Sequence, residues 1–179
     1  MLSLNNQNRL FTNSKLVRLS LLIGLGIILF LFESFIPRPL PWLKPGFAHI
    51  ATLMAMYLMG NGAAIIVVLI RVLVGSLLLG SLFNPAFILA MSGGIAATLV
   101  MGITNRYFSQ LFSIFGVSIL GALVHNLTQL ILVELLLVQS FEIFYLAPFM
   151  MLSSIFTGFV VALASNLVIT KISSIMKSD

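Results

Sequence analysis

The chain has 179 residues, of which 60% are hydrophobic and only 7% are charged. A soluble domain carries roughly 25% charged residues, so this composition excludes an ordinary soluble protein and indicates that most of the surface faces lipid. Cysteine is absent from the sequence, which excludes disulfides and thiolate metal sites. The net charge of +5 comes from cations scattered at the ends of apolar segments, which is typical of a membrane protein and not of a nucleic-acid-binding surface.

The N-terminal residues 1–14 are polar, and we expect them to form a flexible cytoplasmic segment. Two basic residues then precede a first apolar segment, about 19–36, which is long enough to cross a bilayer. A cleaved signal peptide has a shorter apolar core, so we interpret this segment as a retained helix. Within it, Ser20 and Gly24 have the small-xxx-small spacing that lets helix backbones approach, either inside the bundle or at a partner subunit.

A proline-rich stretch follows the first apolar segment. Four of the six prolines fall between Glu33 and Gly46, together with the only tryptophan, Trp42. Closely spaced prolines cannot continue a helix and favour extended backbone. We therefore predict that residues 33–46 form a stiff loop that covers the outer mouth of the bundle, with Trp42 as its aromatic anchor.

Five more apolar segments follow this loop, separated by turn signals that include a polar loop at Asn105–Tyr107. The first of the five is short for a membrane span, so we expect it to be tilted or only part-embedded. The expected segments are 47–59, 63–82, 86–103, 111–138 and 146–169.

The distribution of charge predicts the topology. Six spans place both termini on one side of the membrane, and the opposite side then receives only Arg38 and Lys44. The positive-inside rule makes the termini cytoplasmic and places Asn84 and the loop around Glu142 outside. The basic residues on the side of the termini are Arg9, Lys15, Arg18, Arg106, Lys171 and Lys177.

These observations predict an all-α integral membrane protein, a six-transmembrane-helix bundle with cytoplasmic N and C termini. A single transmembrane domain spans 15–175, and a short tail follows at 176–179. The length leaves no room for a second, soluble domain.

Arg71 is the most informative single residue, because it lies near the middle of the third span. An arginine at that depth costs roughly 2.5–3.5 kcal/mol on insertion scales, so it must face the protein interior or a wet cavity. Gly75, one turn further on, leaves space on the same helix face. Two interpretations stay open: Arg71 binds an anionic group of a ligand, or it forms a structural ion pair with a buried glutamate.

Other polar side chains extend from mid-membrane toward the outside. His125 and Asn126 lie near the middle of the fifth span, and Glu134 lies toward its outer end. An interhelical hydrogen bond explains any one of them, but the whole set favours a ligand cavity that opens outward. The residues that we predict to contact substrate are Arg71, Glu33, Trp42, His49, Asn84, His125, Asn126 and Glu134.

The sequence contains no recognisable motif for a catalytic or metal-binding site. The two histidines lie on different helices without metal-ligand spacing, the three glutamates are dispersed, and the only aspartate is Asp179. Magnesium-dependent diphosphate chemistry needs clustered carboxylates to hold the metal. We therefore expect that the chain is not an enzyme and uses no cofactor or metal.

Several runs of the sequence together resemble one membrane family. Over about Leu19 to Leu163 the chain is similar to the family called heptaprenyl diphosphate synthase component I, also called the Gx transporter family. That family looks like the substrate-binding (S) components of energy-coupling factor (ECF) vitamin transporters. The runs are Glu33-Ser34 with IPRPLPWLKPG, RVLVGSLLLGSLFNPAF from Arg71 to Phe87, Ser92-Gly93-Gly94, and Gly121-Ala122 with His125-Asn126.

The resemblance implies a six-helix S-component fold in a bacterial cytoplasmic (plasma) membrane, with an outward-facing pocket that the loop between the first two helices closes. It also implies docking on a T component, here through Ser20 and Gly24, and two ATPase subunits that use the ATP. The ligand would be vitamin-like or an isoprenoid or quinone precursor. Two alternatives stay open: a non-catalytic membrane subunit associated with heptaprenyl diphosphate synthesis, and an autonomous secondary transporter.

Overall fold

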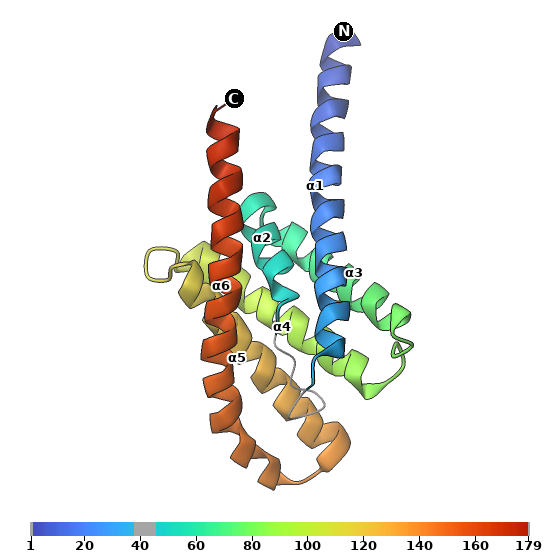
Figure 1. Cartoon of the computed structure of the whole chain (residues 1–179), viewed down its shortest axis with the longest axis vertical. Coiled ribbons are helices and arrows are strands. Elements are labelled where there is room, and N and C mark those ends of the chain that lie inside the picture. The colour runs from blue at the N-terminus through green and yellow to red at the C-terminus, as the bar shows by residue number, and fades with distance from the viewer. Residues whose placement is uncertain (1, 38–45, 179) are drawn as a thin grey trace.

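The computed structural model describes residues 2–37 and 46–178, with side chains for 13–37 and 46–174. Over these ranges the chain is helical and contains no strand. The chain reverses direction from helix to helix, and Figure 1 shows both termini at the same end of the bundle. The elements are α1 (Leu2–Phe35), α2 (His49–Met59), α3 (Asn61–Leu78), α4 (Pro85–Tyr107), α5 (Ile114–Val133), a π-helical turn η1 (Glu134–Val138), a 3-10 helix η2 (Phe141–Leu146) and α6 (Ala147–Ser178).

Helix length confirms a multi-pass membrane protein. Five helices in the described part of the chain are long and apolar enough to cross a bilayer, namely α1, α3, α4, α5 with η1, and η2 with α6. The exception is α2, whose 11 residues span about 16 Å against about 30 Å of hydrocarbon. The described part of the chain therefore contains five helices of spanning length, and the sixth crossing that the sequence predicted stays a prediction.

Proline and glycine set several helix boundaries near the expected positions. α1 ends at Phe35, two residues before Pro37. Gly60, at φ 97°, separates α2 from α3 and adopts a backbone conformation that other residues rarely reach. α4 begins at Pro85, with Asn84 as its N-cap residue.

One loop differs from the sequence-based expectation, and both terminal segments are helical. Residues 2–14 belong to α1, which begins at Leu2, and the expectation that they are flexible stays a prediction. Asn105–Tyr107 was expected to be a loop, but it forms the last turn of α4, which the bond from the Phe108 N–H to the Thr104 carbonyl closes at 2.9 Å. The expected tail at 176–179 is helical as far as Ser178.

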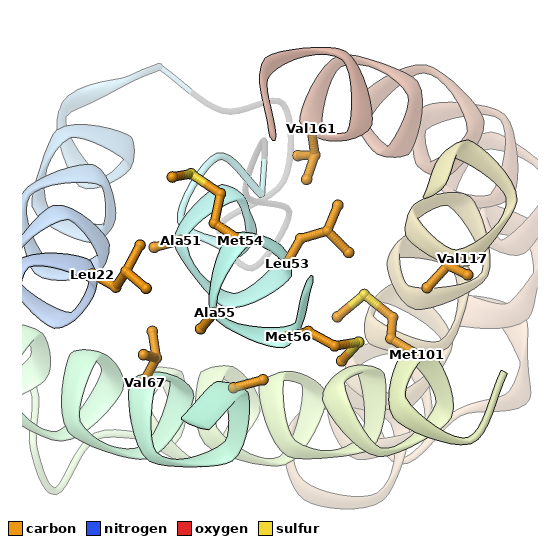
Figure 2. Packing of buried hydrophobic residues seen from close by; sticks show 11 residues of the cluster. Leu22, Ala51, Leu53, Met54, Ala55, Met56, Val67, Met101, Val117 and Val161 are labelled. Carbon is orange, nitrogen blue, oxygen red and sulfur yellow. The ribbon is translucent and has the colours of Figure 1, made fainter. Parts of the chain in front are cut away.

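The short helix α2 lies at the centre of the bundle. Figure 2 shows it enclosed by the surrounding helices, with Leu22 of α1, Val67 of α3 and Val161 of α6 pointing toward it. A helix that is buried on nearly every side belongs to the core of a protein. α2 is therefore shorter than a full membrane span, as expected, but it does not lie at the membrane surface. Its buried residues are His49, Ala51, Thr52, Leu53, Met54, Ala55 and Met56.

α5 and α6 are held together by a close backbone contact. A Cβ atom built on Gly158 would lie 2.7 Å from the Cα of Ile119, so only glycine permits this approach. The Ser118 Oγ donates a 2.8 Å hydrogen bond to the Gly158 carbonyl at the same crossing. This contact fixes the position of α5, the helix that carries His125 and Asn126.

Candidate binding site

Arg71 lies at the meeting point of α1, α2, α3 and α5, and its side chain is only 3% exposed. Its Nη2 atom is 3.4 Å from His49 Nδ1 on α2. The His49 ring in turn stands edge-on to the ring of His125 on α5, with 4.8 Å between ring centroids and 78° between the planes. Three polar side chains that the sequence placed on separate helices therefore form one buried cluster.

Glu33 joins this cluster from α1, and it is 2% exposed. Glu33 lines the same small cavity as Arg71, so the two side chains bring opposite charges to one buried space. The Glu33 Oε1 atom also accepts a 2.8 Å hydrogen bond from the Ala48 N–H. Glu33 therefore compensates the buried charge of Arg71 and ties the end of α1 to the residue before α2.

Glycines let neighbouring helices approach the cluster closely. A Cβ atom on Gly26 of α1 would lie 3.2 Å from Arg71 Cδ, and one on Gly93 of α4 would lie 2.8 Å from His125 Nδ1. The sequence suggested Gly75 as the residue that makes space for Arg71. In the structure the Phe30 ring fills the space at Gly75, and Gly26 on another helix accommodates the arginine.

The space beside these side chains is small. A cavity of about 10 Å³ lies next to Arg71, and a second of about 20 Å³ extends toward Asn126, with His49 and His125 lining both. A single water needs roughly 10–15 Å³, whereas small-molecule pockets are typically about 300–1,000 Å³. Arg71 Nε has no hydrogen-bond partner among the described atoms, so a buried donor is available at this position.

Asn126 links α5 to α6, because its side-chain amide bonds to two residues of α6. Its Nδ2 atom donates to the Ser154 Oγ at 2.7 Å and to the Met150 carbonyl at 3.3 Å. Our sequence-based reasoning did not identify Ser154, although a pair of serines inside an apolar span is a signal for an interhelical hydrogen bond. The sequence equally gave no reason to place Gly26 against Arg71.

Two predicted site residues lie away from Arg71, and a third lies outside the described residues. Asn84 is exposed and accepts a 3.3 Å hydrogen bond from the Ala86 N–H as the N-cap of α4. Glu134 is half-buried in η1, at the far end of α5. Trp42 lies outside the described residues, as does most of the predicted covering loop. Whether these residues contact substrate stays a prediction.

Ser20 and Gly24 lie on the outer surface of α1. Ser20 is exposed, and a Cβ atom on Gly24 would meet nothing within 4 Å. The small-xxx-small pair is therefore not used for packing inside this bundle. Among the described residues, no three side chains of the His, Cys, Asp and Glu types gather closely enough to hold a metal ion.

Comparison with known families gives one match. Residues 22–168 match the family model described as heptaprenyl diphosphate synthase component I. The matched range includes the whole cluster around Arg71 and extends over most of the chain. No curated protein and no solved structure matches the chain.

Proposed function

We propose that this chain, which belongs to the heptaprenyl diphosphate synthase component I family, is the non-catalytic substrate-binding subunit of an ECF-type importer. The observation that supports this proposal is the cluster of Arg71, His49 and Glu33 inside a membrane-spanning bundle. Ionisable groups at such depth are expensive and usually mark substrate or ion pathways. In this proposal a sixth crossing through α2 completes the bundle, and both termini are cytoplasmic.

The ligand would be a small vitamin-like molecule or an isoprenoid or quinone precursor that enters from outside under the 33–46 loop. The unused Arg71 Nε–H would donate a hydrogen bond to it. Because the space beside Arg71 holds about one water, binding requires the start of α2 to move away from α1 and α5. Such a movement would break the Glu33–Ala48 hydrogen bond and separate the His49 ring from the His125 ring.

Transport would be powered by other subunits. A T component and two ATPase subunits would assemble with this chain, and the ATPases would use the ATP. The open surface at Ser20 and Gly24 supports docking of a partner helix there, because small residues let helix backbones approach closely in lipid.

The name of the matching family favours a second candidate, a non-catalytic membrane subunit associated with heptaprenyl diphosphate synthesis. Purification of the tagged chain from its native membranes separates the two. A T component and ATPases in the purified complex support the importer, whereas a soluble prenyltransferase supports the second candidate. Ligand uptake into liposomes by the purified chain alone, without ATP, would instead favour a secondary transporter.

The docking surface can be tested with a matched pair of variants. Gly24→Leu is expected to abolish co-purification of the membrane partner, because a leucine side chain would keep the two backbones apart. Gly62→Leu is the control, since a Cβ atom there also meets nothing within 4 Å but lies on α3. Equal recovery of the partner with both variants would contradict docking at Gly24.

A further inference from the structure

A groove lies between α1 and α6 at the end of the bundle that carries the chain termini. It encloses about 420 Å³, and its walls include Leu22 and Leu25 of α1, Met54 and Met59 of α2, and Ile172 of α6. Figure 1 shows α1 and α6 continuing beyond the end of α2 toward the two termini. The groove is separate from the Arg71 cluster and has no role in the function proposed above.

The polarity of the groove changes along its length. Among the described residues that line it, Arg18 is the charged one, and it lies two turns, about 10 Å, closer to the N-terminus than Leu25. The other described lining residues are apolar. Exposed Lys15 precedes Arg18 by three residues on α1, and exposed Lys171 precedes Ile172 on α6, so both add positive charge near this end of the groove. A site with a cationic mouth and an apolar interior complements a molecule with an anionic head and a hydrocarbon tail.

We propose that this groove binds an anionic phospholipid of the surrounding bilayer, with one acyl chain between α1 and α6 and the phosphate at Arg18. The volume argues against a transmembrane helix as the occupant. A helix is about 10–12 Å across and rises about 5.4 Å per turn, so it would fill the groove with about one turn. An acyl chain is thinner and flexible, and it follows the narrow space between Leu22, Met54 and Ile172.

The test is native mass spectrometry of the full-length protein, purified in detergent and mixed with equal amounts of dioleoylphosphatidylglycerol and dioleoylphosphatidylcholine. The two lipids share their acyl chains and differ in headgroup charge. We expect one phosphatidylglycerol to be retained in preference to phosphatidylcholine. Arg18→Gln should reduce this preference about fivefold, which corresponds to the loss of one basic contact at a membrane surface.

Two further variants distinguish the contribution of the lipid headgroup from that of the acyl chain. Lys15→Gln removes the same charge from the same helix, but Lys15 does not line the groove, so this variant should reduce the preference clearly less than Arg18→Gln does. Met59→Trp fills the groove and should reduce retention of both lipids. Equal retention of the two lipids by the unmodified protein, or equal effects of Arg18→Gln and Lys15→Gln, would overturn the proposal. Retention of neither lipid would also overturn it and point to a protein occupant.

Discussion

Glu33→Gln is expected to lower the free energy of unfolding by about 3–5 kcal/mol, because it leaves the buried Arg71 charge without the carboxylate that lines the same cavity. Glutamine has nearly the same shape, and its side-chain oxygen can still accept the hydrogen bond from the Ala48 N–H. The substitution therefore removes the negative charge and keeps the described hydrogen bond to Ala48. Thermal unfolding of the detergent-purified protein measures the effect.

The double variant Glu33→Gln with Arg71→Met separates the two interpretations of Arg71. Removing two opposite buried charges together is often nearly neutral, so the double variant should recover most of the stability that Glu33→Gln loses. A double variant that is less stable than Glu33→Gln alone would show that the two charges do not compensate each other.

The same double variant then tests the ligand role of Arg71 in a folded protein. Native mass spectrometry of the protein purified from its own membranes reveals any co-purified small molecule. If Arg71 holds the ligand, the unmodified protein carries that molecule and the double variant does not. A double variant that retains the molecule would assign Arg71 a purely structural role.

The sequence predicted this cluster in part, and for a physical reason. Arg71 is recognisable from one chain because a charge in the middle of an apolar span has few permissible environments. The same argument required a carboxylate partner, and the choice was limited to three glutamates. The sequence alone could not identify which glutamate lies beside Arg71, since Glu33 and Glu134 both lie near the ends of spans. Only the packing of α1 against α3 shows that Glu33 is the residue beside Arg71.

The position of α2 was not predictable from the sequence in the same way. A mostly apolar segment of 11 residues has the same composition whether it faces lipid or protein. In a soluble protein the polar face of a helix reveals its orientation, but in a bilayer both faces are apolar. The segment was therefore expected to be tilted or part-embedded, and its central position emerged only from the structure (Figure 2).

Glycines show the same limit of prediction from sequence. The sequence reports that Gly75 leaves space on the face of α3 that carries Arg71, but it does not report what lies opposite. In the structure Phe30 occupies that space, while Gly26 on α1 accommodates the arginine. The periodicity of one helix identifies a face, whereas the neighbour of that face depends on how the helices are arranged.

Gly158→Ala is expected to destabilise the protein by about 1–3 kcal/mol, because the added methyl group would lie 2.7 Å from the Cα of Ile119. The opposing atom belongs to the backbone of α5, so no side-chain rotation relieves the clash and α5 must shift away from α6. That shift would lengthen the 2.8 Å hydrogen bond from the Ser118 Oγ to the carbonyl of residue 158. It would also displace His125, which α5 carries into the cluster around Arg71.

Gly24→Ala is the matched control, because a Cβ atom at Gly24 meets nothing within 4 Å. Alanine is favoured over glycine inside a helix by about 1 kcal/mol, so this variant should unfold at the same temperature as the unmodified protein or slightly above it. The two substitutions are chemically identical and both lie in helix interiors. Melting temperatures that change in opposite directions would therefore isolate the effect of the contact between α5 and α6. Equal melting temperatures for the two variants would mean that α5 and α6 do not approach each other closely at Gly158.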